Sequence, residues 1–287
     1  FPQKYLESIC EENGHIYSVP FQMDIMMFWV NQELLKQAGL DEIKNTGDFD
    51  ILQKSLKNPD QYAYGDAWEN THVYNSLSQF VNFWGGDYFD WTDPKTKDAA
   101  RYMKSMLDEK NTSPAQFVDQ YEQMEEKFIR GKYGCVFMYT SALGTFLDAD
   151  VYGKNKIHMA PLPVLHKKKA TNIATWQYVL NNASENKDVA VRFLQYAAGY
   201  EGSTEYAKIM KSYPARVDVI ENEDIDLEGI DMIRKYLREY TLNARPLCEN
   251  SMGAVSDMGK LFQGYVLGQC EEDSFFEQAQ NCINTYY

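Results

Sequence analysis

The 287-residue sequence predicts an α/β fold with a largely parallel sheet. Short apolar segments alternate along the chain with longer segments whose apolar residues recur every three or four positions, which is typical of strand–helix units. Strands give way to proline at Pro20, at Pro161 and at Pro214. No repeat, low-complexity run or flexible linker divides the chain, so these prolines are better hinge candidates than any change in composition.

The first elements follow from local signals. A short strand is predicted to end at Pro20, followed by a second apolar run over residues 26–30 and a helix that begins at Asn31. Asn31 is a favourable N-cap, and Gly39 is a favourable residue just beyond the helix end. A second amphipathic helix is predicted over residues 48–56, because acidic residues occupy its first turn.

The rest of the chain continues the alternation. An apolar stripe at helical spacing covers residues 70–84, with Asn70 as the predicted N-cap, and Pro94 opens a helix that runs to about residue 109. The remaining segments predict strands over residues 133–138, 156–161 and 175–180, and helices over 117–130, 141–147, after Ser184, and near 229–241, 254–267 and 273–286.

Composition limits the classes of function. Acidic residues outnumber basic ones by 42 to 28, for a formal net charge of -14. Such a surface repels phosphate backbones and anionic lipids, so we expect neither nucleic-acid binding nor peripheral membrane binding. No apolar run approaches the ~20 residues of a membrane span. Residues 1–13 contain no signal peptide and are interpreted as the continuation of an earlier segment.

Aromatic residues make up 14% of the chain, including 21 Tyr and 5 Trp. Large rings dominate cores, and they also suit a pocket that stacks on sugar rings. The five cysteines are odd in number and lack CxxC spacing, so they indicate neither a disulfide framework nor a zinc site. Cys135 lies in an apolar strand and is expected to be buried. The acidic run over residues 221–228 lacks the pattern of a calcium loop. We therefore expect no metal and no other cofactor.

Motifs of enzymes are missing. The chain has no GxSxG, HExxH, Walker or GxGxxG motif. A glycosidase needs two carboxylates placed across a cleft, and no spacing in the sequence singles out such a pair. We expect no catalytic residue.

Six segments carry a resemblance to a known family. Residues 14–40 contain GHIYSVP, MMFWVN and LLKQAGL, residues 128–146 are FIRGKYGCVFMYTSALGTF, and residues 213–219 are YPARVDV. Further matching segments are 157–164, 175–198 and the C-terminal end from Arg245–Pro246. In this order and spacing they resemble the extracellular solute-binding proteins of ABC sugar importers, the maltose-binding-like family.

The resemblance implies a periplasmic-binding-protein-like α/β fold with two lobes, a hinge and an interlobe cleft. It assigns residues 1–22 and 163–212 to lobe one, and residues 23–162 and 213–287 to lobe two. Members of the family carry further strand–helix units ahead of the first motif. The resemblance therefore also implies that lobe one is incomplete in this chain.

The resemblance places the first crossing between lobes beside the ligand. Asp24 lies there, and a carboxylate can accept hydrogen bonds from two adjacent sugar hydroxyls. The alternative is a turn-forming Asp. Gln22 is its weaker companion. Trp176 and Gln177 begin a strand where the family has small residues, so Trp176 is expected to project into the cleft.

The loop after residue 65 is a second candidate. Trp68, Glu69 and His72 combine a ring face with polar side chains, and the resemblance places this loop at the cleft edge of lobe two. The alternatives are that Trp68 packs into its own domain and that His72 faces solvent.

One departure from the family concerns a stacking ring. The family's sugar-stacking Trp aligns with Ser141, and a preceding Gly aligns with Tyr139. We therefore expect Tyr139 or a neighbouring aromatic residue to take over the stacking.

The resemblance implies capture of a sugar or oligosaccharide outside the cell and its delivery to the permease of an ABC transporter. The complete protein is expected to be a monomer, either lipid-anchored or periplasmic, that binds without turnover. Alternatives are a polyamine, an iron complex or a peptide as ligand, where Asp24 and Glu69 would begin a set of acidic contacts. A carbohydrate-active enzyme and a non-transport adhesin or signalling module are further alternatives.

Overall fold

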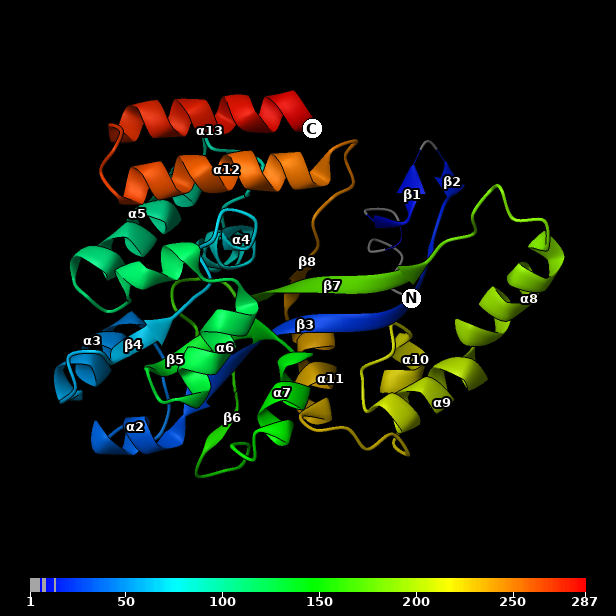
Figure 1. Cartoon of the computed structure of the whole chain (residues 1–287), viewed down its shortest axis with the longest axis horizontal. Helices are drawn as coiled ribbons and strands as arrows, with labels where there is room; N and C mark the ends of the chain where they lie inside the picture. The colour runs from blue at the N-terminus through cyan, green and yellow to red at the C-terminus, as the bar shows by residue number, and fades with distance from the viewer. Residues whose placement is uncertain (1–5, 7–8, 13) are drawn as a thin grey trace. The chain divides into compact units, whose positions relative to one another are not determined.

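The computed structural model describes residues 6, 9–12 and 14–287. The expectation about residues 1–13 falls in part on residues outside this set. The chain forms two compact units: unit 1 comprises Phe1–Ile25 and Asn172–Leu247, and unit 2 comprises Met26–Thr171 and Cys248–Tyr287. The chain passes from one unit to the other within strand β3 (Val19–Asn31), within β7 (Ala170–Tyr178) and after Leu247 (Figure 1).

The unit boundaries differ from those that the resemblance implied. Residues 213–247 belong to unit 1, whereas they were expected in lobe two. Backbone pairing accounts for the difference, because the Met23 N–H donates to the Tyr213 carbonyl over 2.9 Å and the Ala215 N–H donates to the Phe21 carbonyl over 3.0 Å. The second boundary, within β7, also comes later in the chain than residue 162.

Strand β3 unites the short strand and the apolar run that the sequence predicted separately. Pro20 lies inside it, because the register with β7 shifts between Pro20 and Gln22. A bulge of this kind is where a sheet tolerates a residue without an N–H. The predicted cap at its end is confirmed: the Asn31 side chain accepts hydrogen bonds from the backbone N–H groups of the first turn of α2 (Gln32–Gln37).

The second half of β3 is the centre of the sheet in unit 2. It pairs antiparallel with β5 (Tyr133–Tyr139) on one side and with β6 (Ile157–Ala160) on the other. Of the described strands in this unit, only β4 (Tyr62–Gly65) and β5 pair in parallel. The prediction of a largely parallel sheet is therefore wrong. Alternation of strands and helices leaves strand direction open wherever several helices connect two strands.

Helices surround this sheet (Figure 1). They are α2, α3 (Thr46–Ser55), α4 (Val73–Trp84), α5 (Pro94–Asp108), the 3₁₀ helix η1 (Pro114–Val118), α6 (Tyr121–Ile129), α7 (Ala142–Asp148), α12 (Ser251–Val266) and α13 (Glu272–Tyr286). Helices α12 and α13 lie side by side, and α12 packs on both α4 and α5. The predicted helix over 117–130 is divided between η1 and α6. The predicted N-cap of α4 is wrong, since His72 and not Asn70 precedes the helix.

Many of the aromatic residues lie in the core of unit 2. The largest fully buried side chains there are Trp29, Trp68, Trp91, Tyr64, Tyr133, Phe28, Phe49, Phe80, Phe83, Phe128 and Phe137. Full burial of a large apolar side chain contributes about 1.5–3 kcal/mol to stability. Core packing thus accounts for much of the aromatic enrichment.

Unit 1 is built on the first half of β3, which pairs antiparallel with β7, and β8 (Thr241–Asn243) lies next to β7. Its helices are α8 (Lys187–Ala197), α9 (Tyr200–Met210), α10 (Val217–Ile220) and α11 (Ile230–Glu239), and β1 (Glu11–Glu12) pairs antiparallel with β2 (His15–Ile16). Helix α8 exposes apolar side chains, including Phe193 and Tyr196.

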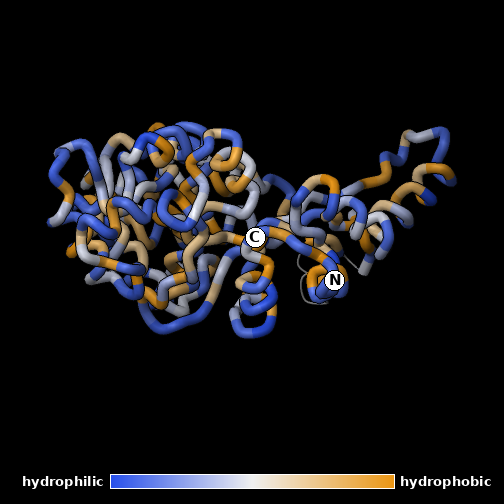
Figure 2. The backbone as a smooth tube through the Cα atoms, turned by 90° about the horizontal axis from the view of Figure 1, so that it is seen from below, coloured by the Kyte–Doolittle hydropathy of each residue, from blue (hydrophilic) through white to orange (hydrophobic). Residues whose placement is uncertain are grey.

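Hydrophobic and hydrophilic residues are interleaved along the whole described chain (Figure 2). Of the helices in the described part, none is both long enough and apolar enough to cross a membrane. All five cysteines are described and are free thiols. Cys135 is buried, as predicted, and its Sγ–H donates to the Ala63 carbonyl over 3.1 Å.

Candidate functional site

In unit 1, the pairing of β3 with β7 brings three of the predicted site residues together. Gln22 lies opposite Trp176 and Asp24 lies opposite Ala174, so Gln22, Asp24 and Trp176 share one face of the strand pair. The Trp176 indole Nε1–H donates to Oδ2 of Asp24 over 3.2 Å. The Asp24 residue is only 6% exposed, while Trp176 is 61% exposed. A fixed carboxylate therefore lies beside an accessible ring.

Tyr206 of α9 completes this cluster. Its hydroxyl donates to Oε1 of Gln22 over 2.5 Å. Burial raises the pKa of Tyr206, and the nearby Asp24 charge adds to the shift, so this phenol stays protonated as a donor. Sequence analysis did not identify Tyr206, because its approach to Gln22 depends on how α9 packs in unit 1. We call Gln22, Asp24, Trp176 and Tyr206 the unit 1 cluster.

Gln177 does not join the unit 1 cluster. Neighbouring residues of a strand point to opposite faces, so Gln177 faces away from Trp176. Its Oε1 accepts hydrogen bonds from the Ser18 hydroxyl and, over 3.6 Å, from the Cys10 thiol. Its Nε2 donates to Thr175 Oγ1 over 3.1 Å. Gln177 thus ties β7 to the segment before β3, and the ligand contact expected of it stays a prediction.

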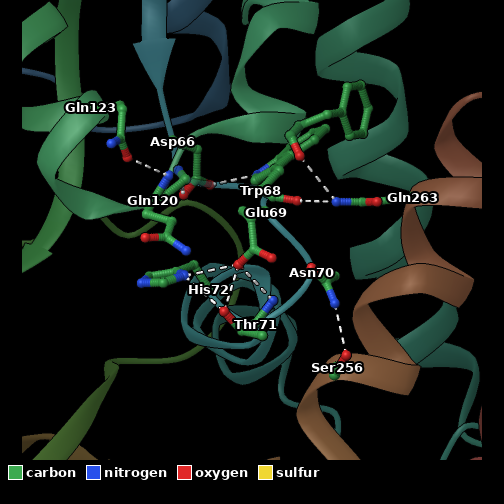
Figure 3. A network of polar contacts seen from close by, with 12 residues as sticks. Asp66, Trp68, Glu69, Asn70, Thr71, His72, Gln120, Gln123, Ser256 and Gln263 are labelled. Atoms are coloured by element: carbon green, nitrogen blue, oxygen red, sulfur yellow. Dashed lines mark hydrogen bonds and ion pairs between the residues drawn. The ribbon is translucent and has the colours of Figure 1, made fainter.

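In unit 2, the candidate residues lie on the loop over residues 66–72, between β4 and α4 (Figure 3). Oε2 of Glu69 accepts three hydrogen bonds: from the Thr71 N–H over 2.9 Å, from the Thr71 hydroxyl over 2.5 Å and from His72 Nδ1 over 3.1 Å. Desolvation alone would raise the pKa of Glu69, but these hydrogen bonds outweigh it and lower the pKa. Glu69 is therefore a carboxylate held in one orientation.

Aromatic rings connect this loop to Tyr139 at the end of β5. The Tyr121 ring contacts His72 edge-to-face at 5.3 Å between centroids and Tyr139 edge-to-face at 6.4 Å. The Tyr139 hydroxyl donates to Oδ1 of Asn75, on the first turn of α4, over 3.2 Å. We call Glu69, His72, Asn75, Tyr121 and Tyr139 the unit 2 cluster.

Sequence analysis did not identify two of these residues, Asn75 and Tyr121. Asn75 lies three positions after His72, and this spacing on one helix face could have indicated it. Tyr121 comes from a distant helix, and no local signal marks it. Ser141 is exposed at the start of α7, two residues after Tyr139.

Trp68 has a different role from the one predicted. It is fully buried at 0% exposure, and its ring packs edge-to-face on Phe117 and Phe262, each at 5.5 Å between centroids. The prediction that Trp68 stacks on a ligand is therefore corrected. The alternative, packing into its own domain, matches its surroundings.

The indole of Trp68 donates through Nε1 to Oδ2 of Asp66 over 2.8 Å (Figure 3). The same oxygen accepts the Tyr64 hydroxyl over 2.7 Å, and Oδ1 accepts the Ala67 N–H over 2.8 Å. Burial raises the pKa of Asp66 to about 6, against the opposing effect of the hydrogen bonds from Tyr64 and Trp68. Asp66 is thus a buried carboxyl group with several donors.

No group of three or more His, Cys, Asp or Glu side chains within the described residues is arranged to hold a metal ion. The unit 1 cluster and the unit 2 cluster each combine a fixed carboxylate with amide and aromatic groups. Such groups accept hydrogen bonds from hydroxyls and stack on flat apolar faces. Chemically, both clusters can accept hydrogen bonds from a polar molecule and stack on its flat faces.

Known proteins resemble this chain over most of its length. A family model described as bacterial extracellular solute-binding protein matches residues 1–204. A probable amino-acid ABC transporter periplasmic-binding protein of Sinorhizobium fredii is 23% identical over 237 residues, which cover 78% of this chain and 53% of that protein. An arabinooligosaccharide-binding protein of Bacillus subtilis is 22% identical over 240 residues, which cover 77% of this chain and 54% of that protein.

This chain thus spans about half the length of these two curated relatives. The structure of maltose-bound T. maritima MalE3 is similar with a TM-score of 0.79 at 16% identity, over 96% of this chain and 74% of that one. That likeness shows the fold, which is α/β and of the periplasmic-binding-protein type. With the family model matching more than half of its residues, the chain belongs to the bacterial extracellular solute-binding proteins.

Proposed function

We propose that this chain is the ligand-binding part of an extracytoplasmic receptor that captures a sugar or oligosaccharide and delivers it to an ABC transporter. The observation that carries the proposal is the pairing of Trp176 with Asp24. An exposed indole ring offers a flat face to the apolar side of a sugar ring, and the adjacent carboxylate accepts hydrogen bonds from its hydroxyls. Binding occurs without chemical change of the ligand.

The proposal assigns lobe one to unit 1 and lobe two to unit 2. In unit 2, Glu69, His72 and Tyr139 are the residues that we assign to ligand contact. In Glu69, all three donors meet at Oε2, and no donor from the described residues reaches Oε1. Oε1 is therefore the acceptor that we assign to a ligand hydroxyl. Ser141 is a peripheral contact in this proposal.

A neutral ligand fits these carboxylates better than a cation does. Asp24 and Glu69 each already accept hydrogen bonds from protein donors that stabilise their charge. A polyamine or a cationic amino acid would need several carboxylates whose charge is not yet compensated. The relatives divide on this point, since one is named for an arabinooligosaccharide and another for amino acids. The clusters favour the carbohydrate.

The remaining parts of the proposal concern the whole protein. Its partner is the permease of the transporter, its location is outside the cytoplasm, either lipid-anchored or periplasmic, and it acts as a monomer. The net charge of -14 argues against nucleic acid as a partner.

The test is isothermal titration of the full-length protein that contains this chain. The panel holds mono- and oligosaccharides, with spermidine, amino acids and a peptide mixture as controls. Micromolar or tighter binding of one glycan, recovered intact by mass spectrometry, is the expected result. Binding of a control with no response to any glycan would overturn the ligand class, and cleavage of the glycan would overturn the assignment as a binding protein.

A further inference from the structure

The loop over residues 66–72, which carries Glu69 and His72, is fixed by contacts with several other segments of unit 2. It lies between β4 and α4, and three sets of contacts hold it from inside unit 2 (Figure 3). The first set is backbone pairing: the Trp68 N–H donates to the Gln116 carbonyl over 2.9 Å, and the Glu69 N–H donates to the Asp119 carbonyl over 3.2 Å.

The second set comes from α12. Gln263 Nε2 donates to the Trp68 carbonyl over 2.5 Å, and the Asn70 side chain donates to the Ser256 hydroxyl over 2.7 Å. The helix backbone also lies directly on the loop, because a Cβ atom added to Gly259 would be only 2.0 Å from the Asn70 carbonyl oxygen. The loop therefore packs directly against α12, which fixes its position.

The third set is the carboxyl group of Asp66. It is 2% exposed and accepts from Tyr64 before it, from Ala67 next to it and from the Trp68 indole after it. These three contacts join the end of β4 to the loop through one side chain. Trp68 is also locked between Phe117 and Phe262. The position of Trp68, and with it the start of the segment that bears Glu69, depends on this carboxyl group.

We propose that Asp66 is the positioning residue of the ligand site in unit 2: it touches no ligand, but by holding the Trp68 indole it sets where Glu69 and His72 stand. The inference rests on the proposed function only in that Glu69 and His72 contact the ligand. A buried carboxylate is stabilised by donors that all point at it. An amide in its place has one acceptor oxygen, so its NH₂ group would face either the Ala67 N–H or the donors of Tyr64 and Trp68.

The protonation state of Asp66 offers a specific readout. Two donors share Oδ2, so protonation of the carboxyl group weakens at least one of these hydrogen bonds. Three other titratable groups interact with Asp66, namely Tyr64 of β4, Tyr121 of α6 and Tyr133 of β5. Burial raises the pKa of each of these phenols, so they remain neutral while Asp66 titrates. The ionisable side chains on the loop itself, Glu69 and His72, are controlled for below.

The first measurement is NMR on the intact protein without ligand. The Trp68 indole N–H resonance, assigned by its loss in Trp68→Phe, is followed from pH 4.5 to 8. We expect it to shift with an inflection that disappears in Asp66→Asn and persists in His72→Gln and Glu69→Gln. An unchanged inflection in Asp66→Asn would overturn the proposal.

The second measurement is amide hydrogen exchange of the same variants at pH 7. The backbone N–H groups of Trp68, Glu69 and His72 donate to backbone carbonyls and not to the Asp66 carboxyl group. Their protection from exchange therefore reports the position of the loop. We expect Asp66→Asn to lower their protection roughly 10-fold, while amides of β5 keep theirs. Glu125→Gln is the matched control, because it neutralises another carboxyl group of unit 2 whose pKa is raised by burial, and its hydrogen-bond partner is Thr145 of α7 rather than a residue of the loop.

Equal protection of the three loop amides in the wild type and in Asp66→Asn would contradict the positioning role. If Asp66→Asn fails to fold, Trp68→Phe removes the donor and keeps the carboxyl group, and the same loss of protection is expected. For a glycan that binds the wild type, the affinity of Asp66→Asn is expected to fall roughly 10-fold, and unchanged affinity would overturn the link to the ligand. These NMR results stand even if no glycan binds, so failure of the proposed function is distinguishable.

Discussion

Trp176 donates its indole N–H to Oδ2 of Asp24 over 3.2 Å, although 152 positions separate the two residues in the sequence. The antiparallel register of β3 and β7 creates this contact, because it sets Gln22 opposite Trp176 and Asp24 opposite Ala174. The carboxylate is buried and the ring is 61% exposed. The hydrogen bond therefore orients a ring face that remains accessible, as the proposed contact with a sugar ring needs.

Replacement of this ring should reduce affinity with little effect on folding. Trp176→Ala removes a large apolar contact worth about 1.5–3 kcal/mol, so we expect the dissociation constant of the best glycan to rise roughly 10- to 100-fold. The free energy of unfolding should change by no more than about 0.5 kcal/mol, because the ring is mostly exposed. Titration calorimetry and chemical denaturation measure the two effects.

The matched control for that variant is Tyr196→Ala on α8. Tyr196 is 57% exposed, lies in the same unit and is outside the unit 1 cluster. It should bind the glycan as tightly as the wild type does. Equal losses of affinity in both variants would point to a general effect on unit 1 and would count against stacking by Trp176.

Neutralising the carboxylate of Asp24 tests its proposed hydrogen bonds to the ligand. Asp24→Asn retains an oxygen that can accept from Trp176, so the fold should persist. Hydrogen bonds to a charged acceptor are about twice as strong as those between neutral groups, so we expect affinity for a neutral glycan to fall roughly 10-fold. Calorimetry at low and at high salt should give similar losses. A loss that depended strongly on salt would indicate a cationic ligand instead.

Two glycines of α12 make a matched pair for stability. In Gly259→Ala the new methyl group meets the Asn70 carbonyl, with only 2.0 Å available, so we expect about 1–3 kcal/mol of destabilisation. In Gly264→Ala the nearest atom, Gln269 Oε1, is 3.8 Å away, and the better helix propensity of Ala should stabilise the protein by about 1 kcal/mol. Urea unfolding of both variants checks these signs. Similar stability of the two would mean that the loop over residues 66–72 does not rest on α12.

Asp66 should give the stability of unit 2 a distinctive pH dependence. Its pKa rises from 3.8 to about 6 on folding, so the folded state binds the proton more tightly. The Asp66 contribution to the free energy of unfolding therefore decreases by on the order of 3 kcal/mol as pH rises from about 4 to about 6. Above pH 6, where Asp66 is ionised in the folded and the unfolded state, this contribution stops changing. Hydrogen bonds lower the pKa of Asp218, of Asp257 and of Glu272, whose stabilisation is lost as pH falls.

The difference in the free energy of unfolding between the wild type and Asp66→Asn isolates the contribution of Asp66, since the other carboxylates are common to both proteins. We expect the variant to gain stability relative to the wild type as pH rises from 4 to 7, measured by denaturant unfolding at each pH. Parallel curves across this window would show that Asp66 keeps its ordinary pKa in the folded protein.

Several elements could be predicted from the sequence because their signals are local. Asn31 caps α2, Pro94 lies in the first turn of α5, and Gly39 has the positive φ expected beyond a helix end. Capping depends on residues within one turn, so the sequence contains all the information that it needs.

Other features depended on partners that are distant in the sequence. Trp68 was expected to face a ligand at the cleft edge, but Phe117, Phe262 and Asp66 surround it. Gln177 follows Trp176 directly and faces the other way, toward Ser18. A list of polar and aromatic residues cannot assign faces until the register of the strands is known.

The sequence by itself determined the α/β class, most of the helices and strands, the family motifs and the candidate residues Asp24, Glu69, His72 and Trp176. Only the tertiary structure decided the antiparallel direction of β3 with β5 and β7, the membership of residues 213–247 in unit 1 and the addition of Tyr206, Asn75 and Tyr121 to the two clusters. The physical reason is the range of the interactions. Caps and periodicity act within a few residues, whereas strand direction, burial and side-chain clusters depend on segments brought together by folding.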